Sequence, residues 1–138
     1  MAHRIFLDSS AFVALYNQDD RFHEMSVALL DNLVRQNTLL LTSDYVIDEV
    51  ITALRTRANH DVATQFASAY RELPMGLCGI YPVYFPEALR IFKRYKDKTY
   101  SFTDCASFSY MLAHNIDTAF TFDHHFAQFG FIVLPDRP

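Results

Sequence analysis

Four acidic residues occupy positions from which their carboxylates could act together. Asp8 directly follows the apolar run over residues 5–7, and Asp123 follows a second apolar run over residues 118–122. Such runs are typical of strands that are buried on both faces of a sheet. Asp8 and Asp123 are therefore predicted just past the carboxyl ends of two strands, where open α/β sheets bind their ligands.

The other two acids, Asp104 and Glu49, belong to predicted helices. Asp104 begins an apolar helical segment, and Glu49 lies inside the segment over residues 45–57. Structural roles alone could account for three of the acids, with Asp8 and Asp123 as helix N-caps and Asp104 as part of a capping box. Glu49 lies too far inside its helix to cap it, so its structural alternative is an exposed helical glutamate.

A shared edge of the sheet favours a joint role for the acids. In a parallel sheet every strand-to-helix junction lies at the same edge, so Asp8 and Asp123 meet there and Asp104 can join them. Two unit charges ~4 Å apart repel by about 1 kcal/mol in water and about 4 kcal/mol at a partly buried site, and a cation must offset this repulsion. An all-oxygen set of ligands selects Mg²⁺ or Mn²⁺ rather than zinc, and a carboxylate-held Mg²⁺ is suited to phosphodiester hydrolysis.

The elements that must position these acids follow from the periodicity of the apolar residues. Strands are predicted over residues 5–7, 39–41, 77–83, 118–122 and 131–134. Helices are predicted over residues 10–16, 22–36, 45–57, 61–73, 86–95, 104–114 and 123–128. This alternation predicts a single α/β domain over residues 1–138, with a parallel sheet of about 4–5 strands covered by helices on both faces. The helix over residues 104–114 is apolar on nearly every side and is expected to be buried.

Several polar residues near these elements have structural interpretations. Asp19 and Asp20 are predicted to cap the helix that follows them, and Asp44 is predicted to cap the helix that carries Glu49. The pair His124 and His125 follows the fourth strand closely enough to touch a substrate, but the surface of a short helix is the favoured position for both.

Composition limits the class of protein. Of the 138 residues 51% are hydrophobic, and the formal net charge is −4. No apolar run approaches the ~20 residues that span a bilayer, and the start of the chain lacks the pattern of a secretory signal, so a cytoplasmic location without a membrane partner is expected. Cys78 and Cys105 lack the spacing of zinc ligands and are predicted to be buried, reduced thiols.

Four segments of the chain resemble the PIN-domain ribonucleases and, among them, the VapC toxins of prokaryotic toxin–antitoxin pairs. The segments cover residues 6–10, 42–49, 101–108 and 120–126, the last followed by residues 129–131. Each segment alone is weakly specific, but four of them in this order and spacing are distinctive. The resemblance covers essentially the whole length, so residues 1–138 are expected to form one PIN domain.

The resemblance implies a metal-dependent endoribonuclease that is the toxin of a type II toxin–antitoxin pair. Asp8, Glu49, Asp104 and Asp123 match the acidic positions of the family, which implies that they are catalytic and that they bind Mg²⁺ (or Mn²⁺). A metal-activated water would attack the RNA phosphodiester in line. The implied partners are an RNA substrate, a cognate antitoxin encoded by an adjacent gene, and a second copy of the chain in a homodimer.

Other residues could assist the four acids. Ser9 and Thr121 could orient carboxylates, although plain turn and strand roles are the simpler interpretation. Removing the four acids from the sixteen leaves twelve, which the twelve Lys and Arg residues balance. The basic run over residues 90–98 could contact RNA phosphates or form a solvated helix end, and Arg55 and Arg57 are a second candidate for contact with RNA.

Two alternative functions are considered. The first is a non-catalytic PIN-like module that binds RNA or protein, although such a module needs no metal site. The second is a phosphohydrolase of the haloacid-dehalogenase type with Asp8 as the nucleophile. That chemistry usually requires a second aspartate two residues later, where this chain has Ser10, and a phosphate-binding lysine that is not evident.

Overall fold

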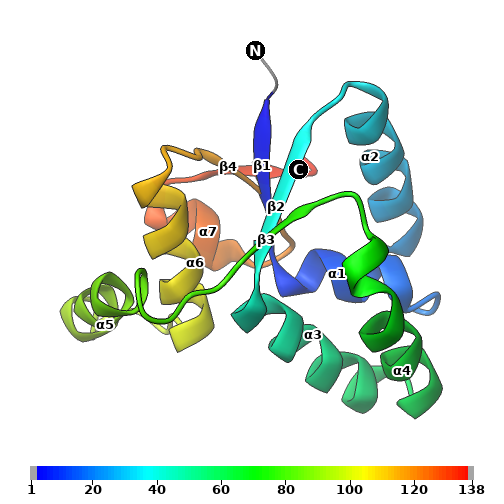
Figure 1. Cartoon of the computed structure of the whole chain (residues 1–138), viewed down its shortest axis with the longest axis horizontal. Helices are drawn as coiled ribbons and strands as arrows, with labels where there is room; N and C mark the ends of the chain where they lie inside the picture. The colour runs from blue at the N-terminus through cyan, green and yellow to red at the C-terminus, as the bar shows by residue number, and fades with distance from the viewer. Residues whose placement is uncertain (1–2, 137–138) are drawn as a thin grey trace.

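A parallel five-stranded sheet forms the centre of the computed structural model, which describes residues 3–136 (Figure 1). The strands are β1 (Arg4–Leu7), β2 (Leu39–Ser43), β3 (Gly76–Cys78), β4 (Thr118–Phe120) and β5 (Ile132–Leu134). The helices are α1 (Ser9–Tyr16), α2 (His23–Arg35), α3 (Asp44–Arg57), α4 (His60–Ala69), α5 (Phe85–Arg94), α6 (Phe102–Ala113) and α7 (His124–Phe129). All neighbouring strands are parallel, and their order is β3-β2-β1-β4-β5. These elements confirm the predicted α/β fold.

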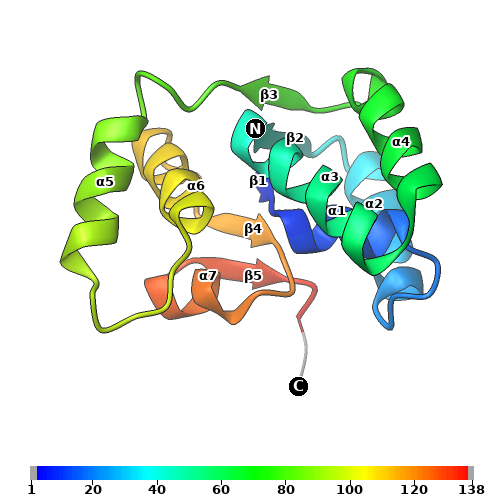
Figure 2. The same cartoon turned by 90° about the horizontal axis from the view of Figure 1, so that it is seen from below.

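Helices cover both faces of the sheet. In Figure 2, α1 to α4 lie on one side of the strands and α5 to α7 lie on the other. The chain moves outward from β1 to β3 with its helices on the first face, and then crosses back to β4 with α5 and α6 on the second face. Because parallel crossovers are right-handed, this change of direction changes the covered face. The helices that follow β1 and β4 therefore diverge and leave a crevice at the carboxyl ends of these two strands.

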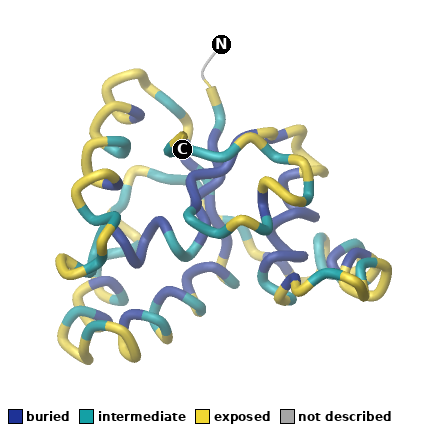
Figure 3. Tube along the Cα trace, turned by 180° about the vertical axis from the view of Figure 1, so that it is seen from behind, coloured by how far each residue is buried: buried dark blue, intermediate teal, exposed yellow. Residues whose placement is uncertain are grey.

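Helix α6 lies in the core, as predicted. Its residues 104–111 are all buried, and Phe108 packs against the rings of Phe126 and Phe129 at centroid distances of 5.0 and 4.4 Å. Figure 3 shows buried residues along the strands at the centre and exposed residues along the outer helices. Full burial of a phenylalanine stabilises a fold by about 1.5–3 kcal/mol, so these rings hold α6 firmly against α7.

The strand predicted over residues 77–83 is wrong beyond Cys78, where β3 ends. The Ile80 N–H donates a hydrogen bond to Asp44 Oδ1 at 3.0 Å, which draws the backbone away from the sheet. The predicted cap by Asp44 is wrong for the same reason, since its carboxylate is engaged with this loop. The cap of α3 is Ser43, whose hydroxyl accepts a backbone N–H from the first turn at 3.2 Å.

Two helix boundaries also differ from the predictions. Asp19 and Asp20 do not cap α2, which starts after Phe22, and Asp20 Oδ1 accepts the Phe22 N–H at 2.8 Å in the preceding turn. The helix predicted over residues 61–73 is α-helical only to Ala69 and then tightens into a short 3₁₀ turn.

The two cysteines are free thiols. Cys105 is buried and Cys78 is half-buried, and neither forms a disulfide, so the prediction of buried free thiols is confirmed for Cys105 and only in part for Cys78. Burial raises the pKa of Cys78 to about 12 and that of Cys105 to about 11, so both thiols remain protonated at neutral pH.

Within residues 3–136, each helix is too short or too polar to cross a bilayer.

Candidate active site

One cavity contains the four acids that the sequence singled out. It has a volume of about 540 Å³ and lies in the crevice at the carboxyl ends of β1 and β4. Its lining includes Asp8, Glu49, Asp104 and Asp123. The parallel topology therefore brings together residues that are separated by up to 115 positions in the chain.

Asp8 is buried at the floor of this cavity, with 2% of its surface exposed. It occupies the N-cap position of α1, but its side chain makes no cap hydrogen bond. Asp8 Oδ2 instead accepts hydrogen bonds from the hydroxyls of Thr121 at 2.8 Å and Ser10 at 3.1 Å. Asp8 Oδ1 is buried without a hydrogen-bond partner among the described residues. Helix capping therefore does not explain this side chain.

The surroundings of Asp8 favour a bound cation. Its pKa is raised to about 7, mainly by burial, and the carboxylates of Asp104 and Glu49 add to the rise while the Thr121 hydroxyl opposes it. A buried polar atom without a partner costs about 1–3 kcal/mol, and more when it is charged. A divalent cation beside Asp8 Oδ1 would both satisfy this oxygen and neutralise the cluster, so the residues present fit a metal ion with oxygen ligands.

Asp104 has a structural role in addition to its place in the cavity. Its carboxylate accepts the Ser101 N–H at 3.0 Å, and the Ser101 hydroxyl accepts the Asp104 N–H at 3.0 Å, which confirms the predicted capping box at the start of α6. Burial raises the pKa of Asp104, and the nearby carboxylate of Asp123 raises it further. The capping box thus holds a buried carboxylate at the edge of the cavity.

Hydrogen bonds also fix the positions of Asp123 and Glu49. Asp123 caps α7 by accepting the His125 N–H at 2.9 Å, and its own N–H donates to the Thr121 hydroxyl at 2.9 Å. The half-buried Glu49 accepts a hydrogen bond from the Ser9 hydroxyl. Ser9 and Thr121 therefore do more than fill a turn and a strand, because each contacts one of the predicted carboxylates.

His125 is the residue of the site that the sequence interpretation missed. Only 13% of its side chain is exposed, whereas the side chain of His124 is 79% exposed. His125 Nδ1 lies 2.9 Å from Asp104 Oδ2 and 3.2 Å from Asp123 Oδ1. The predicted surface position is thus right for His124 and wrong for His125. The signal in the sequence is that His125 lies two residues after a predicted ligand that also caps the helix.

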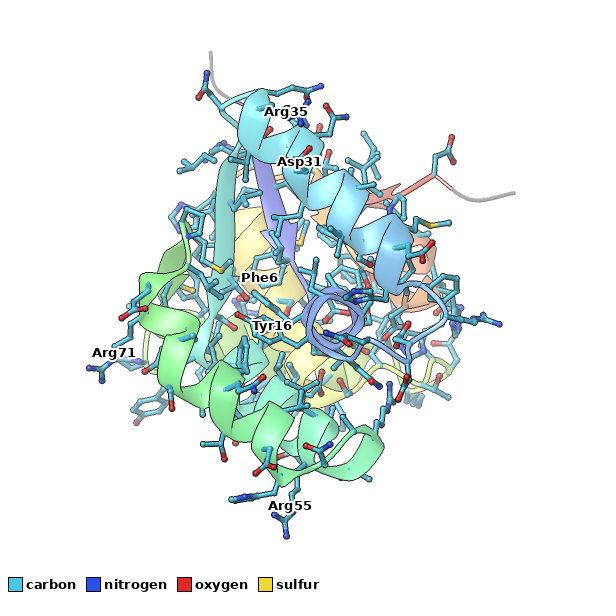
Figure 4. All side chains as sticks on the ribbon, turned by 90° about the vertical axis from the view of Figure 1, so that its right-hand side faces the viewer. Phe6, Tyr16, Asp31, Arg35, Arg55 and Arg71 are labelled. Carbon is cyan, nitrogen blue, oxygen red and sulfur yellow. The ribbon has the colours of Figure 1, made fainter. Side chains whose placement is uncertain are left out.

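The basic residues that could contact RNA lie in two parts of the structure, on α3 and on α5 with the connector after it. Arg57 lines the acidic cavity, whereas Arg55 points away from the body of the protein in Figure 4. The run over residues 90–98 lies on α5 and the connector after it, and Arg90 pairs with Glu87 at 2.7 Å. Arg57 is therefore the basic candidate that the structure places beside the four acids.

The sequence also matches a family model, that of the PIN domain, over residues 5–132. The chain belongs to the PIN domain family. It is 28% identical to the 23S rRNA-specific endonuclease VapC20 of Mycobacterium tuberculosis over 128 residues, which are 93% of this chain and 95% of that protein.

Two solved structures show the same fold. The crystal structure of Mycobacterium tuberculosis VapC20, described as a sarcin–ricin loop cleaving toxin, matches with a TM-score of 0.85 and 29% identity, over 97% of this chain and 99% of that one. The structure of VapBC2 from Rickettsia felis, bound to a DNA fragment from its promoter, matches with a TM-score of 0.69 and 15% identity, over 94% and 96% of the two chains. The second likeness concerns the fold alone.

Proposed function

We propose that this protein is a metal-dependent endoribonuclease that hydrolyses RNA phosphodiester bonds and is the toxin of a type II toxin–antitoxin pair. The observation that carries this proposal is the buried Asp8, whose Oδ1 has no hydrogen-bond partner within residues 3–136 and which lines a cavity with three other carboxylates. Membership of the PIN family and the likeness to VapC20 support the same reaction.

In this proposal Asp8, Glu49, Asp104 and Asp123 hold Mg²⁺ or Mn²⁺. The bound ion would lower the pKa of a water and stabilise negative charge on the phosphate. The protein's own contribution is to fix the carboxylates beforehand, because hydroxyls, a capping box and a helix cap orient them. Hydrolysis then adds a hydroxyl to phosphorus and a proton to the leaving oxygen.

The surroundings of the acids suit a phosphate group. The first turns of α1 and α6 open on the cavity, where backbone N–H groups and the positive ends of the helix dipoles favour an anion. Arg57 adds a cation on the wall formed by α3, within reach of a neighbouring phosphate of the same strand. We infer that RNA crosses the cavity with its backbone over the acids, and ribosomal RNA, the substrate named for VapC20, is the first RNA to test.

We further propose that an antitoxin encoded by an adjacent gene blocks this cavity, and that the chain forms a homodimer. Both proposals come from the resemblance to VapC toxins. Sequencing the adjacent reading frame tests the first, since it should encode a chain of under about a hundred residues with a DNA-binding N-terminus. The molecular mass in solution tests the second.

Paired substitutions test the activity. Asp8→Asn and Asp104→Asn each remove one charge while keeping side-chain size, and each should reduce metal-dependent RNA cleavage by more than about 100-fold and relieve growth arrest when the protein is expressed alone. Asp48→Asn is the matched control, because Asp48 is exposed on the helix that carries Glu49. Equal cleavage by Asp8→Asn and the parent protein would refute the site. A pure protein that binds metal but cuts no RNA would favour the non-catalytic module.

A further inference from the structure

The imidazole of His125 lies between two of the four carboxylates. Its Nδ1 is 2.9 Å from Asp104 Oδ2 and 3.2 Å from Asp123 Oδ1. Asp123, His124 and His125 each offer a ligand atom, and these atoms lie within 4.8 Å of one another. Two carboxylate oxygens that face one ring nitrogen need either a hydrogen on that nitrogen or a metal ion between them and it.

The two separations between His125 Nδ1 and its carboxylate neighbours, Asp104 Oδ2 and Asp123 Oδ1, are those of ligand atoms that can share a metal ion. Ligand atoms about 2.1 Å from one ion are about 3.0 Å apart at right angles and about 3.4 Å apart at tetrahedral angles. The two separations from His125 Nδ1, 2.9 and 3.2 Å, lie close to these values. Asp104 Oδ2 and Asp123 Oδ1 also accept backbone N–H groups, but a carboxylate oxygen has a second lone pair for a cation.

The ring of His125 is held in the orientation that a ligand requires. Its Nε2 lies 2.9 Å from the Thr99 hydroxyl, and the ring of Tyr100 packs edge-on at a centroid distance of 5.4 Å. Histidines that bind metal through one nitrogen commonly donate the other N–H to an oxygen, which fixes the tautomer and the ring. Thr99 supplies that oxygen and leaves Nδ1 directed at the carboxylates.

A second observation points independently to a cation in this cavity. Asp8, which lines the same cavity, is 98% buried, and its Oδ1 has no hydrogen-bond partner among the described residues. The lining of the cavity thus offers both oxygen and nitrogen donors, from Asp8, Asp104, Asp123 and His125. Imidazole binds first-row transition ions, Mn²⁺ the most weakly of them, whereas Mg²⁺ strongly prefers oxygen ligands and water, so a nitrogen ligand favours Mn²⁺ in the comparison with Mg²⁺.

We propose that His125 Nδ1 is a direct ligand of the divalent ion in this site and makes the site prefer Mn²⁺ to Mg²⁺. This inference rests on the proposed function, because it assumes that the acidic cavity is the metal site. The imidazole would be a fifth ligand beside the four carboxylates, and it would give a preference for Mn²⁺ over Mg²⁺ that carboxylates alone do not give. His124 is not required, since it is exposed and its Nδ1 is 3.8 Å from Asp123 Oδ1.

Pulsed electron paramagnetic resonance of the Mn²⁺-loaded protein tests the ligand directly. A coordinated imidazole couples its ¹⁴N nucleus to the Mn²⁺ electron spin, and labelling all histidines with ¹⁵N should shift that modulation without any substitution. We expect this coupling in the parent protein and in His124→Ala. We expect its loss in His125→Phe, which keeps a ring against Tyr100, and in His125→Asn, a smaller change available if the first variant does not fold.

Metal titrations provide a second readout that does not depend on activity. His125→Phe should weaken Mn²⁺ binding by about 10-fold or more while Mg²⁺ binding changes much less. Bound Mn²⁺ without a histidine coupling, or a coupling that His124→Ala removes, would overturn the inference and leave the proposed nuclease intact. A protein that binds neither Mn²⁺ nor Mg²⁺ would contradict the metal-dependent nuclease as well.

Discussion

At the scale of single residues, the surroundings of Asp8 oppose the ionisation of its carboxylate. Its carboxylate is buried and its pKa is raised to about 7, so deprotonation near neutral pH places a poorly solvated charge beside other acids. The free-energy cost of burying an ionised carboxylate beside other acids is typical of a functional group rather than a structural one. A cation converts the same arrangement into a binding site.

The raised pKa of Asp8 predicts how stability depends on pH. The unfolded chain loses this proton near 3.8 and the folded chain near 7, so the folded state binds more protons in this interval and its stability falls as pH rises. The interval corresponds to a loss on the order of 4 kcal/mol, complete above about pH 7. Denaturant unfolding of metal-free protein between pH 4 and 8 measures this loss.

Asp8→Asn is the control for this prediction. It removes the titrating group but keeps an oxygen that can accept the Thr121 hydroxyl, so the decline in stability with pH should be markedly smaller. At pH 8, without metal, the variant should be more stable than the parent protein. Identical pH profiles for the two proteins would show that the ionisation of Asp8 does not cause the loss of stability at higher pH.

At the scale of elements, the start of α6 combines stability and chemistry. The capping box of Ser101 and Asp104 closes the helix and also fixes a carboxylate of the site. The cap of α4, where Asn59 accepts the Val62 N–H at 2.9 Å, likewise satisfies an N–H of the first turn but lies outside the lining of the cavity. Comparison of these two caps separates the stabilisation of a helix, which both provide, from the positioning of Asp104, which only the cap of α6 provides.

Ser101→Ala and Asn59→Ala form the matched pair. Each should lower the free energy of unfolding by about 1 kcal/mol, because each removes one N-cap acceptor. Only Ser101→Ala should also weaken Mn²⁺ binding, by up to about 10-fold, because the first turn of α6, which carries Asp104, loses the acceptor of the Asp104 N–H while the Ser101 N–H still holds the carboxylate. Chemical denaturation and metal titration measure the two effects. Equal metal affinity in both variants would mean that the capping box does not position Asp104.

At the scale of the whole molecule, topology brings the acids together. The change of face between β1 and β4 opens the crevice, and this follows from the strand order and the right-handed crossovers. The fold and the shared edge of Asp8, Asp104 and Asp123 could be predicted from sequence because apolar runs and helical periodicity are local signals, whereas Glu49 is assigned to the site by the resemblance to PIN domains. The contact of Ile80 with Asp44 and that of His125 with Asp104 link residues far apart in the chain, so no local pattern predicts them.

Metal binding should stabilise the whole domain. An ion at about 100 times its dissociation constant adds about 2.7 kcal/mol to the free energy of unfolding, since only the folded chain assembles the site. For a domain of this size the melting temperature should rise by roughly 5–10 °C. Thermal scans with and without Mn²⁺ measure the rise, and Asp104→Asn should abolish most of it. A rise of the same size in that variant would place the ion elsewhere.

The most direct test of the central claim is the position of the ion itself. Crystals of the protein soaked in Mn²⁺ should give an anomalous scattering peak inside the cavity lined by the four acids, in contact with Asp8 Oδ1. A protein that cleaves RNA with Mn²⁺, but whose crystals show the ion bound outside this cavity, would contradict the account.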